Sequence, residues 1–402
     1  MFTCFCEPSR LFIERMIKMS DFEIMDNRLI KYSPPISLFL TPRTVVVPNG
    51  VTSIGEKAFY DKRIERVILP ESVVEIESSA FSHCKNLTEI ILPNGLKTIG
   101  EEAFEGCINL SSVNIPTSVT SIGKRAFFFT SITKAVIPNG ITKIECHTFD
   151  LCKELSEVTI PNSVNYIGEG AFSGCNNLKN VSLPESITII EKSAFEYCGI
   201  TEIEIPCKVR EIKEDTFYEC KRLGKVTLPT GLKGIGKQAF SQCENLRSID
   251  IPDGVIAIGS NAFSSTGLLE AIVPNSVTSF DAWVFAACKN LTTVKLSDKT
   301  TSLYGTFNKC TALRSIQIPS SVTKIGDRAF GGCRSLKSVF IPDGVTHIGA
   351  FAFAGCVNLK TLRIPKSVCS IGMDAFENCR SLSFKSIIQQ NQAYKRSKTA
   401  KQ

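Results

Sequence analysis

The chain has 402 residues, 43% of them hydrophobic and 21% charged, with 26 Phe and a single Trp. This composition predicts a folded chain with a buried core and excludes a disordered, highly charged one. The formal net charge of +7 argues little for nucleic-acid binding, because nearly all of it falls in residues 380–402 and the rest of the chain is nearly neutral. Residues 380–402 hold no acidic residue, and their basic residues are Arg380, Lys385, Lys395, Arg396, Lys398 and Lys401.

The first twenty residues differ from everything that follows, and we expect a non-repeat extension there. Charges interrupt any apolar run, at Glu7, Arg10, Glu14 and Arg15. The extension therefore predicts no signal peptide, and no apolar run of about 18 residues suited to a membrane-spanning helix occurs in the chain. A repeat-like stretch begins at Met19, so a start at Met19 instead of Met1 stays open to N-terminal mass spectrometry. We expect residues 21–47 to cap the first repeat.

Residues 48–384 consist of fifteen units of 22 or 23 residues. A representative unit reads IPDGVTHIGAFAFAGCVNLKTLR, from Ile341 to Arg363. A period of this length is typical of a leucine-rich solenoid, in which each unit is one coil of a continuous core. Ser297 takes the place of the proline in one unit, and the fourteen prolines that align the others are Pro48, Pro70, Pro93, Pro116, Pro138, Pro161, Pro184, Pro206, Pro229, Pro252, Pro274, Pro319, Pro342 and Pro365.

Two apolar positions recur in the units. Phe stands eleven residues after the proline in all fifteen, from Phe59 to Phe376, allowing for one deleted residue in the unit of Ser297. Ile stands six residues after the proline in thirteen units, with Phe280 and Leu303 as the exceptions. Since an apolar side chain at the same point of every coil stacks on its copies, we expect these residues to form a continuous spine.

Each proline is preceded by a segment of the type Leu-x-x-Ile-x-Leu, such as residues 87–92. Its alternation predicts a short strand, which ends where proline has no N–H to donate. Stacking these strands predicts one continuous parallel sheet with rungs ~4.8 Å apart. The segment Ile-Gly-x-x-Ala-Phe, as in residues 348–353, predicts one turn of α or 3-10 helix on the back. Residues such as Glu77 and Lys213 replace its Gly, so we expect no obligatory positive φ there.

These elements predict a β-rich α/β solenoid, a right-handed leucine-rich-repeat coil, followed by a basic tail at 385–402. A longer period lies above the single coil. The 22-residue units that begin at Pro48, Pro116, Pro184 and Pro252 are each 68 residues apart and lose one residue just before the strand. This spacing indicates that the array grew by copying blocks of three coils.

The proline-ended strand, Ile-Gly-x-x-Ala-Phe and a following Cys-x-x-Leu together resemble the BspA-like, or Treponema-type, leucine-rich repeats. The resemblance covers about residues 44–384 and repeats fifteen times. It implies the leucine-rich-repeat fold and the role of a surface antigen or adhesin that engages host matrix proteins or other cells. Many family members carry a signal peptide or a membrane anchor, and neither is recognisable in this sequence.

The 17 cysteines do not predict a disulfide framework or a zinc site. Lys62, Thr130 and Thr266 also occur in the cysteine position of the repeat, so we interpret these cysteines as small buried hydrophobes. The three histidines, His83, His147 and His347, fall at different repeat offsets and predict no shared catalytic or metal site. The cysteines of the repeat position are Cys84, Cys107, Cys152, Cys175, Cys198, Cys220, Cys243, Cys288, Cys310, Cys333, Cys356 and Cys379.

The variable positions of the strands predict a binding surface. Apolar residues, among them Ile68 and Ile91, gather at the N-terminal end, and acidic residues follow in the middle, so a partner could meet a hydrophobic patch beside a negative one. A drifting solvated surface is the alternative. Residues 274–318 are irregular and would either expose Trp283 as a contact anchor or be a degenerate coil. The candidate partner-binding residues are Ile68, Ile91, Glu157, Glu202, Glu204, Asp250, Trp283 and Phe340.

The sequence therefore predicts a non-enzymatic protein-interaction module with no cofactor, metal or catalytic residue. Its partner would be a protein or glycan and not a nucleic acid, and the resemblance implies display at a cell surface or secretion. An intracellular leucine-rich-repeat scaffold is the alternative, favoured by the missing signal and by the free cysteines, which suit a reducing compartment.

Overall fold

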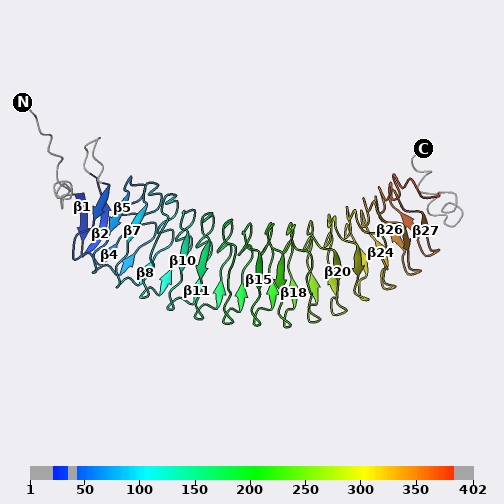
Figure 1. Cartoon of the computed structure of the whole chain (residues 1–402), viewed down its shortest axis with the longest axis horizontal. Helices are drawn as coiled ribbons and strands as arrows, with labels where there is room; N and C mark the ends of the chain where they lie inside the picture. Colours follow the sequence, from blue (N-terminus) through cyan, green and yellow to red (C-terminus); the bar gives the residue numbers. More distant parts are fainter. Residues whose placement is uncertain (1–20, 35–42, 384–402) are drawn as a thin grey trace, which may run out of the picture. The chain divides into compact units, whose positions relative to one another are not determined.

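The computed structural model describes residues 21–34 and 43–383, and the predictions for residues 1–20 and 385–402 lie outside these ranges. The chain divides into two compact units, Met1–Val164 and Asn165–Gln402. In each unit the repeats form successive coils whose strands pair in parallel, rung after rung (Figure 1). The leucine-rich solenoid expected from the sequence is therefore confirmed at the level of a coil with parallel strands.

Each coil can carry two short strands, not one. A three-residue strand ends two residues before the proline, and these strands form what we call the front ladder. In the first unit they are β3 (Thr44–Val46), β5 (Arg66–Ile68), β7 (Glu89–Ile91), β10 (Lys134–Val136) and β12 (Glu157–Thr159). In the second unit they are β15 (Glu202–Glu204), β17 (Lys225–Thr227), β20 (Glu270–Ile272), β22 (Thr293–Lys295), β25 (Ser338–Phe340) and β27 (Thr361–Arg363).

A two-residue strand lies five and six residues after the proline, and these strands form the rear ladder. In the first unit they are β4 (Ser53–Ile54), β6 (Glu75–Ile76), β8 (Thr98–Ile99), β9 (Ser121–Ile122) and β11 (Lys143–Ile144). In the second unit they are β13 (Tyr166–Ile167), β14 (Ile189–Ile190), β16 (Glu211–Ile212), β18 (Gly234–Ile235), β19 (Ala257–Ile258), β21 (Ser279–Phe280), β23 (Ser302–Leu303), β24 (Lys324–Ile325), β26 (His347–Ile348) and β28 (Ser370–Ile371).

The prediction of one continuous sheet was wrong in two respects. The rear ladder was missed, because a strand of two residues is too short to show an alternating pattern. The front ladder is also interrupted in every third coil, before Pro116, Pro184, Pro252 and Pro319. The outward residues there are polar and, except for Gln317, short, as in Asn180 and Ser182 before Pro184. Such side chains compete for backbone hydrogen bonds and suit strands poorly.

The predicted helical turn is also absent, since residues 22–34 and 43–383 contain no helix. The backbone amides alternate between two kinds of acceptor, as the coil of Phe240 illustrates. Ala239 and Ser241 donate to carbonyls three residues back, to Gly236 and Gln238, at 3.3 and 3.0 Å. Phe240 donates instead to the carbonyl of Ala262 in the next coil, at 2.8 Å. A helix would keep all of these bonds within the coil.

This alternation needs a left-handed backbone at two points of each coil. Gln238 and Gln242 have φ values of 54 and 63°, and equivalent residues recur nine and thirteen residues after the prolines. Most of these residues are not glycine, so each costs about 1–2 kcal/mol of backbone strain. The inter-coil bonds offset that strain. The Gly of Ile-Gly-x-x-Ala-Phe is not among the positive-φ residues, as expected.

The phenylalanine spine is present in both units. In the first unit, rings from Phe59 to Phe149 stack with centroids 4.8–5.5 Å apart. In the second unit, the rings from Phe172 to Phe376 stack with centroids 5.2–6.0 Å apart. These rings are almost fully buried. Sequence periodicity alone was enough to predict this spine.

An antiparallel hairpin precedes the first coil. It consists of β1 (Phe22–Met25) and β2 (Arg28–Tyr32), and β2 pairs in parallel with β4. The Tyr32 ring is fully buried and lies 5.1 Å from that of Phe59. Tyr32 therefore occupies the place that Phe has in later coils, and its ring covers the end of the spine.

The repeated cysteines form a buried column beside the spine. Their thiols donate to the carbonyl of the phenylalanine one coil earlier, as Cys220 does to Phe195 at 3.0 Å and Cys333 to Phe307 at 3.1 Å. Burial raises the pKa of the Cys84 and Cys333 thiols to about 12. These thiols are free and neutral, so the prediction that they are structural is consistent with their environment.

Removing one ring from the spine should be costly. We expect Phe240→Ala to lower the free energy of unfolding by about 3–5 kcal/mol, because the two neighbouring rings cannot close the cavity. The exposed Phe340→Ala is the matched control and should change it by less than about 0.5 kcal/mol. Urea unfolding followed by circular dichroism measures both variants. Equal losses would contradict the spine as the main source of stability.

The cysteine column also predicts steep alkaline unfolding. A thiol whose folded pKa lies near 12 and whose unfolded pKa lies near 9 keeps its proton only in the folded state between these values. The contribution of each thiol to the free energy of unfolding is therefore fully present below about pH 9. It falls by about 1.4 kcal/mol per pH unit as the pH rises from about 9 toward about 12. Urea midpoints from pH 7 to 11 test this. Cys220→Thr with Cys243→Thr should flatten the decline, and an unchanged slope would refute it.

Candidate functional site

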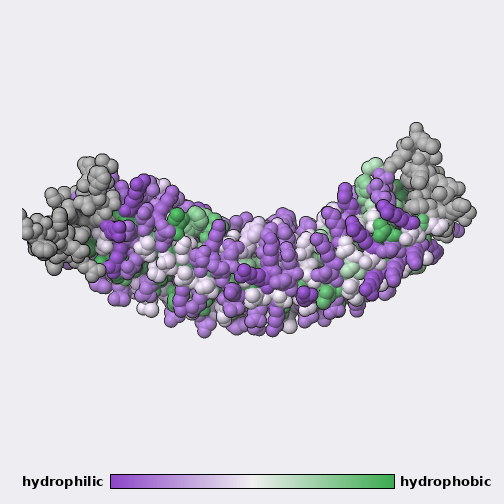
Figure 2. All heavy atoms as spheres, turned by 45° about the horizontal axis from the view of Figure 1, so that its top comes forward, coloured by the Kyte–Doolittle hydropathy of each residue, from purple (hydrophilic) through white to green (hydrophobic). Residues whose placement is uncertain are grey.

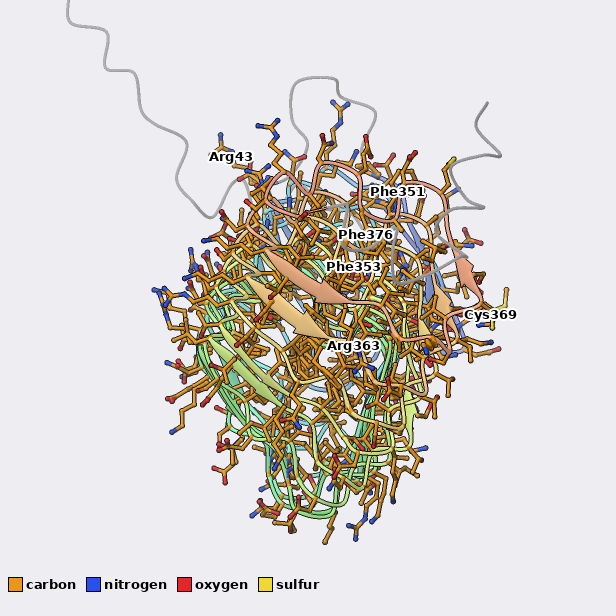
Figure 3. The ribbon with its side chains drawn as sticks, turned by 90° about the vertical axis from the view of Figure 1, so that its right-hand side faces the viewer. Arg43, Phe351, Phe353, Arg363, Cys369 and Phe376 are labelled. Atoms are coloured by element: carbon orange, nitrogen blue, oxygen red, sulfur yellow. The ribbon has the colours of Figure 1, made fainter. Side chains whose placement is uncertain are left out.

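The outward side chains of the front ladder form a surface distinct from the core. In the end-on view, Phe353 and Phe376 lie inside the coil, whereas Arg363 lies below them at the end of β27 and Cys369, next to β28, lies at the right-hand edge (Figure 3). We call the side chains two, four and five residues before each proline the front face. The space-filling view shows apolar residues as separate patches among polar ones (Figure 2).

In the first unit the front face carries an apolar strip. Val46, Ile68 and Ile91 are direct neighbours on β3, β5 and β7. Val46 is 48% exposed and Ile91 39% exposed, whereas Ile68 between them is half-buried. An ion pair between Arg66 and Glu89, 3.0 Å long, lies beside the strip. The two isoleucines predicted from the sequence are thus brought together, with Val46 added.

Glu157 does not contribute free negative charge. It faces Lys134 across β10 and β12, and the Lys134 Nζ lies 2.8 Å from the Glu157 carboxylate. Both side chains are more than half exposed, so the pair contributes little to stability. It nevertheless neutralises the local charge, which removes Glu157 from the predicted acidic surface.

In the second unit, Glu202 and Glu204 line a shallow groove of about 440 Å³, which we call the acidic groove. Its floor passes over the interrupted rung, where Asn180 and Ser182 are short. Glu185 lies at one side, and Lys225 and Thr227 of β17 lie at the other. Asp250 is exposed on a later coil and does not line the groove. The structure therefore brings together two of the predicted acidic residues and adds Glu185.

Glu185 interacts with a cysteine that the sequence did not single out. The Cys207 amide donates to the Glu185 carboxylate at 3.1 Å. A hydrogen bond to the Glu185 carboxylate and its negative charge raise the pKa of the exposed Cys207 thiol, and the same contact lowers the pKa of Glu185. Cys207 stands just after Pro206, outside the cysteine position of the repeat. This unusual position is the feature of the sequence that could have singled out Cys207.

Trp283 is not a front-face residue. It lies in the turn after β21 with a φ of 64° and is half-buried. Its indole covers Gly305 of the next coil so closely that a Cβ there would clash, and Tyr304 covers Gly326 in the same way. The Ser297 coil lacks one residue in its own turn, between Leu303 and Phe307, because the register of Ser302 with Lys324 is kept. These contacts give Trp283 a packing role.

Phe340 stands on the front face and is 60% exposed. Arg363 is its neighbour on β27, and Gln317 faces it from the preceding coil. Basic residues that the sequence analysis missed lie five residues before three consecutive prolines, namely Arg314, Lys337 and Lys360. The candidate residues on the strands lie two or four residues before a proline, so the column five before each proline was not compared from coil to coil. Comparing the position five before each proline would have found them.

The three histidines do not form a common site. His147 pairs with Asp150 at 2.9 Å, His347 contacts the Thr346 hydroxyl at 2.7 Å, and His83 meets the ring of Tyr60 edge-on. Within residues 21–34 and 43–383, no three or more His, Cys, Asp or Glu side chains are arranged to hold a metal ion. In the same ranges, no helix has the length and apolar character needed to span a membrane.

Coils with an apolar spine, parallel short strands and a variable outward face define a leucine-rich-repeat solenoid. The model of the family described as BspA type leucine-rich repeat region matches residues 41–156, 142–268, 210–306 and 303–397. The chain therefore belongs to the BspA-type leucine-rich repeat family, as its motifs suggested.

Solved structures from bacteria resemble the chain over most of its length. A leucine-rich repeat protein from Bacteroides ovatus is 29% identical, with a TM-score of 0.69 and 88% of both chains covered. A leucine-rich cell surface protein from Faecalibacterium prausnitzii is 26% identical, with a TM-score of 0.51, covering 88% of this chain and 92% of the other. The pneumococcal vaccine antigen PcpA, at 18% identity and a TM-score of 0.50, covers 94% and 96% and shows the fold alone. No curated protein matches the chain.

The contact at the edge of the acidic groove predicts a reactivity change. Glu185→Gln removes the negative charge that raises the Cys207 pKa, so at pH 8 more of this thiol should be ionised and its alkylation by iodoacetamide should accelerate several-fold. Mass spectrometry of timed samples measures the rate. The exposed Cys369 is the internal control and should keep its rate. Equal rates at Cys207 before and after the substitution would contradict the contact.

Proposed function

We propose that this protein is a non-enzymatic binding module whose front face recognises a protein or glycan. One observation carries the proposal: the buried positions repeat from coil to coil, whereas the front face changes from an apolar strip to an acidic groove and then to an exposed Phe340. Stability requires only the repeating part. A surface that varies over an invariant core is free to be shaped by a partner.

The proposed contact residues are Ile68, Ile91, Glu202, Glu204, Asp250 and Phe340. Exposed apolar side chains beside charged ones combine area that can be buried with charges that select the partner. Glu157 is left out because Lys134 neutralises it, and Trp283 because it packs on Gly305. The surface in question is therefore narrower than the sequence indicated.

Display at a cell surface is the second part of the proposal. It is supported by the likeness to the F. prausnitzii protein, which is described as a cell surface protein. The cysteine column does not oppose this location, because buried neutral thiols are protected from oxidation wherever the protein resides.

An intracellular scaffold is the competing function, and the free Cys207 and Cys369 favour it. Both thiols are exposed, and exposed free thiols suit a reducing compartment. Protease treatment of intact cells separates the two locations. Surface display requires that the protein be degraded while a cytoplasmic marker survives. If the protein and the marker both survive the protease, the result supports the intracellular scaffold.

Front-face binding is tested with the purified chain on intact cells by flow cytometry. We expect Ile68→Glu with Ile91→Glu, or Glu202→Lys with Glu204→Lys, to weaken binding about tenfold or more, equal to about 1.4 kcal/mol. The controls are Val74→Glu, which also replaces an apolar residue with an acidic one, and Glu211→Lys with Glu244→Lys, which also reverse two charges. They lie away from the front face and should change the affinity by less than about twofold relative to the unchanged protein. Losses of equal size in both sets would overturn the front face as the binding surface.

A further inference from the structure

Charge is segregated within the second unit. Residues 165–288 hold eleven Lys or Arg and fifteen Asp or Glu. Residues 289–383 hold thirteen Lys or Arg and five Asp or Glu. The repeat array is thus nearly neutral because an acidic stretch and a basic stretch cancel in the total charge. The last coils carry an excess of positive charge, and its distribution over their surfaces decides what it can bind.

Part of this excess is aligned on the front face. Arg314, Lys337 and Lys360 occupy one position in three successive coils. The Lys337 amide donates to the Arg314 carbonyl at 3.1 Å, and the Lys360 amide donates to the Lys337 carbonyl at 2.9 Å. These bonds hold the three cations in register, one per rung, at the ~4.8 Å spacing of a parallel ladder. All three are exposed, and none pairs with a described acidic residue.

Two further columns run beside these cations. The middle column consists of hydroxyl side chains, Ser315, Ser338 and Thr361, of which the last two are direct neighbours. The outer column consists of Gln317, Phe340 and Arg363, also in register. Short hydroxyl side chains thus lie between longer ones. Arg363 pairs with Asp343 at 3.5 Å, so among the described residues Arg314, Lys337 and Lys360 carry the unpaired positive charge of these columns.

We propose that these nine residues form a basic face that binds an anionic polysaccharide laid along the coil axis. Its sulfate or carboxylate groups would meet the cations of Arg314, Lys337 and Lys360. A sugar ring would stack its apolar side on Phe340, and the hydroxyl column would exchange hydrogen bonds with sugar hydroxyls. The inference rests on the proposed function and names the partner class for one part of the front face.

Two features favour a glycan over other polyanions. Serine, threonine and glutamine side chains both donate and accept hydrogen bonds, as sugar hydroxyls do, whereas phosphate oxygens only accept. Single-stranded nucleic acids bind on successive aromatic side chains that stack the bases. Among the three columns, Phe340 is the single aromatic residue. One platform flanked by hydroxyls suits a chain of sugar rings better than a run of bases.

The test measures binding of defined probes to the full chain by fluorescence anisotropy. The probes are heparin, polygalacturonate, neutral dextran, oligo(dT) and polyglutamate. We expect heparin or polygalacturonate to bind more tightly than oligo(dT) and polyglutamate, with affinity that falls as salt rises, and dextran not to bind. Failure of both anionic glycans to bind overturns the proposal. Tighter binding of oligo(dT) or polyglutamate would also overturn it and assign the face to that polymer.

Paired variants locate the binding. Lys337→Glu with Lys360→Glu should weaken glycan binding about tenfold or more, whereas Lys324→Glu with Lys233→Glu, on or next to the rear ladder, should change it by less than about twofold. Both pairs change net charge equally, so the comparison removes the general attraction of a basic protein. Phe340→Ala should weaken binding several-fold without changing its salt dependence. Equal effects of the two pairs overturn the proposed location.

The same variants separate this inference from the broader proposal. If glycans fail to bind but cell binding still depends on the apolar strip or the acidic groove, only the basic face is refuted. If cell binding ignores every front-face substitution while the Lys337 and Lys360 pair abolishes glycan binding, the general front-face proposal fails and the glycan site stands alone.

Discussion

The fold depends on contacts that each coil makes with the next. In the turns, alternate amides such as that of Phe240 donate to the following coil, and the ring of Phe240 stacks between Phe217 and Phe263. A single coil can satisfy neither its amides nor its apolar side chain, so stability arises from neighbouring pairs. Every coil must therefore keep the same buried positions, which leaves variation to the front face.

The cysteine column follows from the same constraint. The carbonyl of each spine phenylalanine has a second acceptor site open toward the next coil, and a small buried donor such as the Cys220 thiol fits it. Thr130 occupies the same slot without that inter-coil bond: its hydroxyl donates to the Phe127 carbonyl of its own coil and contacts the Cys152 sulfur. A slot that accepts a thiol or a hydroxyl reflects packing and hydrogen bonding. The number of cysteines consequently says little about where the protein works.

The three-coil period inferred from unit lengths reappears in the front ladder. The interrupted rungs carry polar outward residues and do not form strands. Where these residues are short, as Asn180 and Ser182 are, the surface is hollowed between the longer side chains of neighbouring rungs. The acidic groove lies over one such rung, and Ser315 with Gln317 begins the basic face on another. Loss of strand character every third coil thus divides the front face into separate stretches with different chemistry.

The sequence by itself determined the coil length, the phenylalanine spine and the position of the cysteines, because one residue type recurring at a fixed period must stack on its copies. Only the tertiary structure decided how the turns are built, since their inter-coil hydrogen bonds leave no periodic trace and replace the expected helix. It also placed Trp283 on Gly305 and paired Glu157 with Lys134, and the repeat pattern does not reveal such contacts between side chains of neighbouring coils. The structure also aligned Arg314, Lys337 and Lys360 on one face. The net charge of the chain does not reveal this alignment, because it adds up charges without regard to which coil and which face carry them.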